Sequence, residues 1–363
     1  MNKTKHIIGS TARTLLAITF IFSGTVKAID PLGTVYKIED YLKAFGGFFT
    51  DLLPLAEFGA VALIAAECVL GVCLLFNVRT QWTSWLSLAF YLFMTPLTLW
   101  IALTNPVSDC GCFGDALVLT NWQTFWKNII LLSLVIILLV CRKAIPQTFS
   151  WQAELCIAIV GVGLSFGLMG YTYHHLPLID FRPYKIGNHI PTLMEVPEDA
   201  EPDVYETTLI YEKDGVQQKF TLENYPKGDS TWHFVDQHSV LIKKGYEAPI
   251  HDFEILTRDF EDITFDILES EEPVTLITMY DLKKADMSQI EKVRMLLEAN
   301  DPCYILTGSG EMEIEEFCMA HHIDMDYVCT MDPVTLKTIV RANPGMFVVQ
   351  NGTIMEKHNL KQL

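Results

Sequence analysis

Long apolar runs separated by short polar stretches fill the first half of the chain. They cover about residues 7–29, 52–76, 82–104, 122–141 and 151–173. A helix needs roughly 20 apolar residues to cross a hydrocarbon core of about 30 Å, so the pattern predicts five membrane-spanning helices. Arg13 and Lys27 interrupt the first run, and "VKA" at 26–28 is also compatible with a signal-peptidase site. The later spans keep the same orientation in either case.

The pattern changes after residue 180. Short β-rich runs such as "ETTLIYEKDG" and "QKFTLENY" alternate with turns and predict a small β-rich lead-in. Strands and helices alternate further on, with strands at "VTLITMY", "CYILTG" and "DYVCTM", helices over 286–299, 311–322 and 333–341, and a closing hairpin that turns at Asn351-Gly352.

Together these patterns predict four segments. The expected segments are a membrane α-helical bundle (1–145), a fifth transmembrane helix and linker (146–180), the β-rich lead-in (181–242) and a soluble α/β domain (243–363).

Charge supports this division. The chain of 363 residues has a formal net charge of −18. Residues 1–180 carry 10 acids and 10 bases, whereas residues 181–363 carry 34 acids and 16 bases. A neutral apolar half and an acidic polar half are typical of a membrane domain joined to a soluble one. Membrane lipid is therefore an expected partner, and nucleic acid is not, because phosphate binding needs clustered Lys and Arg.

Basic residues at the helix ends predict the orientation. Short loops on the cytoplasmic side are rich in Lys and Arg, and here the bases are Lys3, Lys5, Arg13, Arg79, Arg142 and Lys143. Lys27, Lys37 and Lys43 fall on the opposite side, where acids blur the bias. We expect an inner (cytoplasmic) membrane protein with a cytoplasmic N-terminus and a periplasmic or extracellular C-terminal domain. That side permits disulfides.

The stretch "SDCGCFGDA" (108–116) places two thiols in the loop between the third and fourth spans. Cys110 and Cys112 can close only a small ring through Gly111, and such a strained disulfide would be easily reduced and oxidising toward other thiols. Gly111 and Gly114 supply the permissive backbone that a tight ring needs. The pair is thus a candidate redox site.

Other interpretations of this loop remain open. Asp109 and Asp115 are expected to raise the pKa of the thiols, which would make the pair an acceptor of electrons rather than an attacking nucleophile. The thiols could also lie in a structural turn or be paired elsewhere. A metal site would need Asp109, Asp115 and His174 or His175 as further ligands.

Glu67, within "LIAAECVLG", is the candidate intramembrane site. An ionisable residue in a bilayer usually faces the bundle interior and marks a proton or ligand path. The alternative is a packing role, with hydrogen bonds to Ser87 or Tyr91. The remaining cysteines are expected to be buried, and a disulfide between Cys303 and Cys329 is left open.

The first half carries a family resemblance. The stretches "KAIDPLG" and "CGCFGD" and the four-helix arrangement over about 7–141 resemble the DoxX family and the methylamine-utilisation protein MauE family. The resemblance implies a four-helix bundle in the same broad group as vitamin K epoxide reductase and the quinone-coupled disulfide generators, so a quinone is a possible cofactor. The chain departs from the reductase pattern because no Cys-x-x-Cys lies at the outer end of a helix.

The second half resembles another family. "KKGYEAPIHDFEIL" (243–256) and the order of elements to about 358 are similar to thioredoxin-like proteins of the thiol-reductase and peroxiredoxin kind. The resemblance implies that Pro344 takes the place of the family's cis-proline. The position of the family's catalytic cysteine is occupied by "DLKKAD" (281–286), which has no cysteine. The resemblance therefore implies the fold without the activity.

Two functions remain. The chain is either a thiol-disulfide oxidoreductase or disulfide-maturation factor, using Cys110 and Cys112 on a periplasmic thiol protein client with Glu67 handling a proton, or a non-catalytic scaffold or assembly factor. Small-molecule transport past Glu67 is weaker, because the sequence has no evident repeat or broken helix. No metal and no certain cofactor are expected.

Overall fold

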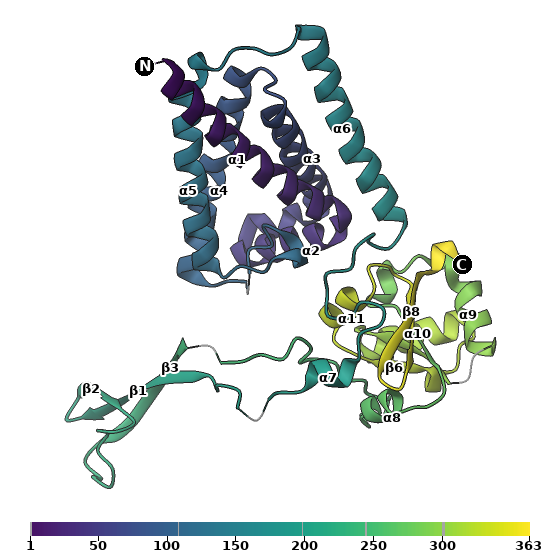
Figure 1. Ribbon diagram of the computed structural model, residues 1–363. Coiled ribbons are helices and arrows are strands. Elements are labelled where there is room, and N and C mark those ends of the chain that lie inside the picture. The colour runs from purple at the N-terminus through teal and green to yellow at the C-terminus, as the bar shows by residue number, and fades with distance from the viewer. Residues whose placement is uncertain (1, 108, 198, 244, 300–301) are drawn as a thin grey trace.

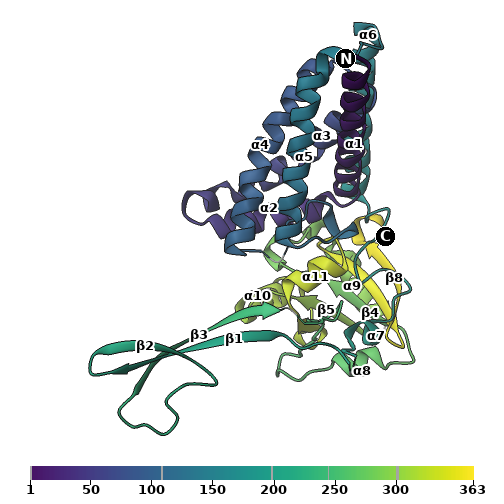
Figure 2. The ribbon, with the colours of Figure 1, turned by 60° about the vertical axis from the view of Figure 1, so that its left-hand side comes forward.

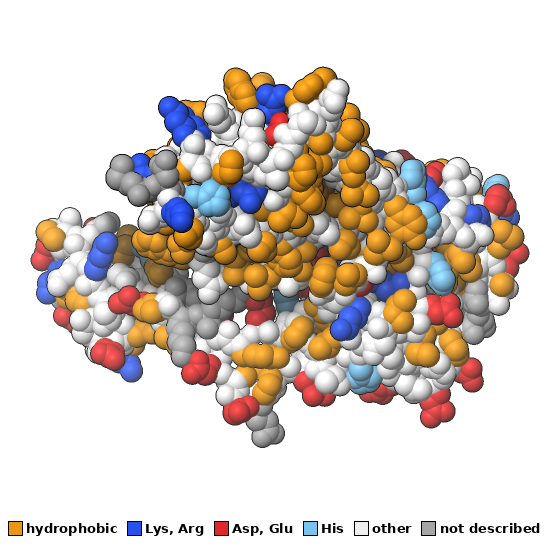
Figure 3. Space-filling view, turned by 45° about the horizontal axis from the view of Figure 1, so that its top comes forward, with side chains coloured by type: hydrophobic (Ala, Val, Ile, Leu, Met, Phe, Trp, Pro, Cys, Tyr) orange, Lys and Arg blue, Asp and Glu red, His pale blue; other side chains and the backbone are white. Residues whose placement is uncertain are grey.

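The computed structural model describes residues 2–107, 109–197, 199–243, 245–299 and 302–363. A helical part formed by the first half of the chain stands on a sheet-containing part formed by the second half (Figure 1). Hydrophobic side chains gather over the helical part and acidic ones over the sheet-containing part (Figure 3), as the sequence pattern predicts.

Five helices in the described residues are long and apolar enough to cross a membrane. They are α1 (Asn2–Ile29), α3 (Ala56–Leu75), which continues the 3-10 helix Gly47–Leu55, α4 (Thr80–Thr104), α5 (Asn121–Cys141) and α6 (Trp151–His174). Leu16 and Phe20 of α1 pack with Leu74 and Val135 in the centre of this bundle. The five predicted spans are confirmed as helices within a few residues.

A shorter helix, α2 (Pro31–Phe45), crosses the end of the bundle that faces the sheet-containing part (Figures 1 and 2). It begins where the sequence predicts a break, because the Asp30 carboxylate caps it by accepting the Gly33 N–H and Pro31 occupies its first position. Val35 packs against Ala56 and Ala60 near the start of α3. Helix α2 therefore covers the end of the bundle that faces the sheet-containing part.

The C-terminal part contains a five-stranded sheet of order β6-β5-β4-β7-β8. Its parallel strands are β4 (Val274–Thr278), β5 (Cys303–Thr307) and β6 (Val328–Thr330), and β7 (Gly345–Gln350) and β8 (Thr353–Asn359) are antiparallel. The hairpin turns at Asn351 and Gly352, both with positive φ, as predicted.

Helices cover both faces of this sheet. The short α8 (Thr264–Leu268) and α11 (Pro333–Ile339) share one core with its strands, and α9 (Ile290–Ala299) and α10 (Glu311–His321) share the other. Helix α7 (Ile190–Met194) lies before residue 243, in the predicted lead-in, but packs into the C-terminal part. Ile190 is fully buried there, and the Leu193 carbonyl accepts the Ile250 N–H. The core of the C-terminal part thus draws on residues well before the predicted boundary.

The remainder of the lead-in is a separate three-stranded sheet of order β2-β1-β3. Strands β1 (Val204–Lys213), β2 (Val216–Thr221) and β3 (His233–Lys243) form a ribbon that projects away from the C-terminal body (Figures 1 and 2). An edge-to-face aromatic cluster of Tyr211, Phe220 and Trp232 supports it.

Candidate functional site

The loop 105–120, here called the thiol loop, joins α4 to α5 at the end of the bundle that carries α2. Within the described part of this loop, side chains from two bundle helices form hydrogen bonds with the backbone of both cysteines. The Tyr41 hydroxyl of α2 donates to the Cys110 carbonyl at 2.6 Å, and the Ser23 hydroxyl of α1 lies 2.8 Å from the Cys112 carbonyl. Both thiols are half-buried and free, so the structure represents the dithiol form.

Two glycines give the thiol loop its tight path. Gly111 and Gly114 have φ of +63° and +51°, in the left-handed region that favours glycine. A Cβ at Gly111 would also lie 3.0 Å from Cγ of Lys37. The segment between the cysteines can therefore lie against α2 only because it has no side chain.

The two carboxylates that flank the thiols form ion pairs. Asp109 pairs with Lys37 at 2.7 Å, and Asp115 pairs with Arg341 of the C-terminal part at 3.3 Å. An ion-paired carboxylate exerts less repulsion on a neighbouring thiolate than a free one. The expectation that these acids raise the pKa of both thiols does not hold for Cys112, whose pKa is lowered.

The surroundings of the two thiols instead shift their pKa values in opposite directions. A hydrogen bond with the Cys110 thiol lowers the pKa of Cys112, and Lys127 and Lys27 lower it further against the opposing effect of burial. The same hydrogen bond, together with burial, raises the pKa of Cys110. Of the two thiols, Cys112 is thus the one whose surroundings favour the thiolate.

Lys27 and Glu67 form an ion pair inside the bundle. Lys27 Nζ lies 2.8 Å from each carboxylate oxygen of Glu67, and the two side chains are about as buried as core residues, with 5% and 6% exposed. Ser23 Oγ is 2.9 Å from Glu67 Oε2. Because this hydroxyl has one proton and also lies next to the Cys112 carbonyl, it donates to one of them at a time and links the ion pair to the thiol loop.

This pair corrects two expectations. Lys27 is not in the outer loop but in the last turn of α1, buried against α3. The partners of Glu67 are Lys27 and Ser23 rather than Ser87 or Tyr91, and Ser87 donates to the Thr83 carbonyl instead. A charge this deeply buried needs such a partner.

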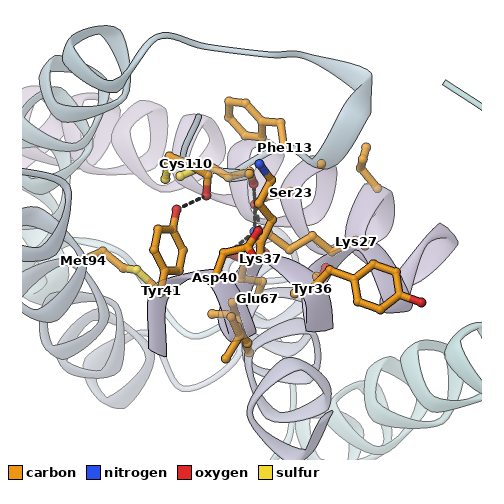
Figure 4. Close-up of a pocket in the computed structure, with 18 of the residues that line it drawn as sticks. Ser23, Lys27, Tyr36, Lys37, Asp40, Tyr41, Glu67, Met94, Cys110 and Phe113 are labelled. Carbon is orange, nitrogen blue, oxygen red and sulfur yellow. Dashed lines mark hydrogen bonds and ion pairs between the residues drawn. The ribbon is translucent and has the colours of Figure 1, made fainter. Parts of the chain in front are cut away.

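A cavity of about 830 Å³ lies beside the thiol loop and the ion pair. Figure 4 shows Tyr41, Ser23, Lys27 and Glu67 gathered around it, with Cys110 at its edge. Much of the remaining lining is apolar and includes Leu63, Phe90, Phe93, Leu97 and Trp100. An apolar cavity with a few convergent polar groups is the usual form of a small-molecule site.

The metal alternative finds no support in the part of the chain that the structure describes. No group of three or more His, Cys, Asp or Glu side chains could hold an ion there. His174 and His175 end α6, where the His175 ring stacks on Tyr171 at 4.2 Å and the His174 carbonyl accepts from Asn359. They do not join Asp109 and Asp115 in a cluster.

The C-terminal cysteines lie in a different environment. Cys303, Cys318 and Cys329 are buried and free, so the possible Cys303–Cys329 disulfide is wrong. Burial raises the pKa of Cys303 to about 12 and that of Cys329 to about 11. The Asn343-Pro344 peptide bond is cis, and the Asn343 side chain donates to the Asp281 carbonyl just after β4.

Several site residues have little signal in the sequence. Ser23 and Lys27 are four residues apart on an apolar helix, which places them on one face and was a readable clue. Lys127 and Tyr41 lie near the thiols only through the packing of α5 and α2. Nothing in the local sequence of Arg341 links it to a loop more than 200 residues earlier.

These features define a membrane protein whose helical bundle carries a thiol loop at the end that meets a sheet-containing domain. Residues 5–141 match the family model of Methylamine utilisation protein MauE, so this part of the chain is a MauE-like membrane region. Residues 205–244, which span the β1–β3 sheet, match a domain of unknown function, DUF8463. Neither the curated proteins nor the solved structures include a match to this chain.

Proposed function

We propose that this protein is a membrane thiol-disulfide oxidoreductase or disulfide-maturation factor whose redox pair is Cys110 and Cys112. One observation carries the proposal: the two thiols lie side by side in one tight loop, and Cys110, Lys127 and Lys27 lower the pKa of Cys112. The thiolate is the form of cysteine that enters exchange reactions. A pair that only shaped a turn would need none of these contacts.

In the oxidising direction, a client thiolate attacks the Cys110 sulfur of the Cys110–Cys112 disulfide. A client–Cys110 disulfide forms, and Cys112 leaves as the thiolate, because the sulfur with the lower pKa is the better leaving group. A second client thiolate then attacks the client sulfur of this mixed disulfide, and Cys110 leaves and takes a proton. The client loses two electrons and two protons, and Glu67 is the proposed acceptor of the proton that Cys110 does not take.

Reoxidation of the dithiol needs a two-electron acceptor, and we propose a lipid-soluble quinone. The residues around the cavity fit such a group, because Phe93, Leu97 and Trp100 offer apolar surface while the amide of Asn128 offers a hydrogen-bond donor. A bound quinone would supply the capacity to take up two electrons and two protons. The chain's own part is to hold the thiol pair and Lys27 beside it.

For the C-terminal part we propose a thioredoxin-like fold that binds rather than catalyses. The mixed sheet with helices on both faces and the cis peptide before β7 support this fold. The segment 281–286 after β4 has no cysteine. The basic ends of the spans support placing this part and the thiol loop on the periplasmic or extracellular side of the cytoplasmic membrane.

Trapping of the mixed disulfide tests this proposal. In a Cys112→Ser variant given a client in its disulfide form, Cys110 should attack the client disulfide and accumulate in a reductant-sensitive mixed disulfide, because no Cys112 sulfur is present to release the client. The Cys110→Ser/Cys112→Ser double variant is the matched control and should give no adduct. Equal adduct levels in the two variants would contradict the proposal.

A scaffold function is the second candidate, favoured by the absence of a thiol in the segment 281–286. It predicts that a Cys110→Ala/Cys112→Ala variant fully restores whatever a deletion strain loses. Failure of that variant, at normal protein levels, would exclude a purely structural role.

A further inference from the structure

Arg341 connects the C-terminal part to two separate segments of the bundle. It lies just after α11 and is almost buried, with 8% exposed. Its Nε is 2.9 Å from Asp30 Oδ2, its Nη2 is 3.3 Å from Asp115 Oδ2, and its Nη1 donates to the Lys337 carbonyl at 2.7 Å. One guanidinium thus joins the cap of α2, the thiol loop and its own domain, which uses the planar geometry of arginine.

The stretch "DPLG" is shaped to receive this group. Asp30 caps α2 by accepting the Gly33 N–H at 3.0 Å. A Cβ at Gly33 would lie 2.7 Å from Asp30 Oδ2 and 3.1 Å from Arg341 Nη2, so glycine leaves the room that the guanidinium occupies. Asp30, Gly33 and Asp115 together are called the arginine socket below.

The two carboxylates of the socket depend on Arg341. Burial alone would raise the pKa of Asp30, but Arg341 and Arg182 bring it below its usual value. Burial raises the pKa of Asp115, and Asp30 adds to this while Arg341 opposes it. Without Arg341, the carboxylates of Asp30, which is 19% exposed, and Asp115, which is 40% exposed, would repel each other without the cation that now pairs with both. Asp115, in the thiol loop, would then move.

Neighbouring contacts show that the socket is the centre of a wider interface. The Tyr36 hydroxyl of α2 donates to the Tyr280 hydroxyl at 3.2 Å. Lys337 Nζ lies 4.9 Å from the Tyr36 ring centre and 5.2 Å from that of Tyr280. The C-terminal part therefore meets the bundle through charged and aromatic groups around the socket, next to the cavity wall.

We propose that the arginine socket is the docking site of the C-terminal part on the membrane region, and that Arg341 is a positioning residue for the thiol pair. Its role in exchange rests on the proposed function, whereas the docking itself does not. By fixing Asp115, Arg341 holds the thiol loop where Cys112 meets its charged neighbours. The titratable groups that face Cys112 are Lys27 of α1, Tyr41 of α2, Glu67 of α3, Tyr91 of α4, Lys127 of α5 and Cys110.

The test uses the full-length protein in phospholipid nanodiscs. Hydrogen exchange of residues 105–120 reports the order of the thiol loop, and the rate of Cys112 alkylation by iodoacetamide at about pH 5, below the pKa of this thiol, reports its thiolate fraction. The variants are Arg341→Gln and Arg341→Lys. The matched control is Arg258→Gln, whose half-exposed side chain pairs with Glu315 at 3.7 Å in the same domain.

Arg341→Gln should speed hydrogen exchange in the thiol loop. It should also slow Cys112 alkylation about threefold or more, which corresponds to a rise of about half a unit in the pKa of Cys112. Arg341→Lys should be intermediate, because an ammonium cannot bridge both carboxylates. Arg258→Gln should match the wild type. Unchanged protection of β4 and β7 shows that the domain still folds. If Arg341→Gln showed the same hydrogen exchange and the same Cys112 alkylation rate as Arg258→Gln, the proposal would be overturned.

Two further comparisons keep the result decisive. Gly33→Ala keeps every charge but crowds the guanidinium, so it should shift both readouts in the same direction as Arg341→Gln by a smaller amount. No shift in Gly33→Ala would contradict the socket. If mixed-disulfide trapping fails while Arg341→Gln still loosens the thiol loop, the proposed function is lost and the docking site stands.

Discussion

The cysteines of the thiol loop and those of the C-terminal core lie in opposite environments. Cys110, Lys127 and Lys27 lower the pKa of Cys112. Cys303 and Cys329 lie in apolar cores, where burial raises the pKa of each thiol. Within one chain, the surroundings of a thiol rather than its presence decide whether it can exchange disulfides.

The comparison also separates the roles of the two parts of the molecule. The membrane region holds Cys112, whose pKa is lowered, and the C-terminal part supplies Arg341, which pairs with Asp115 of the thiol loop. A domain whose own cysteines are buried is therefore still connected to the loop that carries the proposed redox pair.

Substitution of the thiolate should have the largest effect. Cys112→Ser should abolish disulfide exchange with a model dithiol peptide, because the leaving group and nucleophile are lost. Cys329→Ser, a substitution of the same kind in the core, should leave the exchange rate unchanged per folded molecule. The measurement is the rate of peptide oxidation by purified protein after a quinone analogue is added. Equal losses in both variants would remove the contrast between the two groups of cysteines.

Breaking the buried ion pair should destabilise the bundle. Lys27→Met leaves Glu67 buried without its cation, at a cost of about 3–5 kcal/mol. The double variant Lys27→Met/Glu67→Leu should recover most of that loss, because an apolar pair needs no compensation. Unfolding by denaturant in detergent measures both. A double variant as unstable as Lys27→Met alone would show that the pair is not the source of the effect.

Removal of a cation near Cys112 should weaken its thiolate. Lys127→Met should raise the pKa of Cys112, so alkylation at about pH 5, below that pKa, should slow about three- to tenfold for a rise of about 0.5 to 1 unit. Well above both pKa values the rates should converge, because the thiol is then ionised in either protein. Lys283→Met, in an exposed ion pair with Glu313, is the control. A uniform slowing at every pH would indicate altered access instead.

A core cysteine should matter only for packing. Cys329→Ala removes one buried sulfur and should cost about 1 kcal/mol of unfolding free energy through the small cavity that remains. Alkylation of Cys112 in this variant should follow the wild-type profile. A changed profile would mean that the C-terminal core and the thiol loop are coupled more closely than the contacts at Arg341 indicate.

The apolar runs and strand patterns predicted most of the fold because each element is encoded locally. The spans follow from hydrophobic length, and the Asn351-Gly352 turn follows from two residues that tolerate positive φ. The lead-in was harder to predict, since Ile190 joins the C-terminal core through contacts with residues that lie far along the chain.

The candidate site could be predicted only in part. The sequence pointed to Cys110, Cys112 and Glu67 as chemistry-bearing residues. It misjudged the influence of the neighbouring acids, because the cations that pair with them come from α2 and from residue 341. The charge count assigned Lys27 to the loop after the first span, whereas it lies in the last turn of α1 and pairs with Glu67 of α3. Charge compensation between distant segments is a tertiary property that no single stretch reveals.

Differential alkylation of all nine cysteines in the native protein tests whether Cys110 and Cys112 are the redox pair. Membranes are treated with a maleimide that cannot cross them, before and after mild reduction, and each peptide is quantified by mass spectrometry. The account predicts that Cys110 and Cys112 are blocked until mild reduction, that Cys112 then reacts fastest, and that the core cysteines of the C-terminal part stay unlabelled. Free labelling of both loop thiols without reduction, or labelling no faster than that of Cys303 and Cys329, would contradict it.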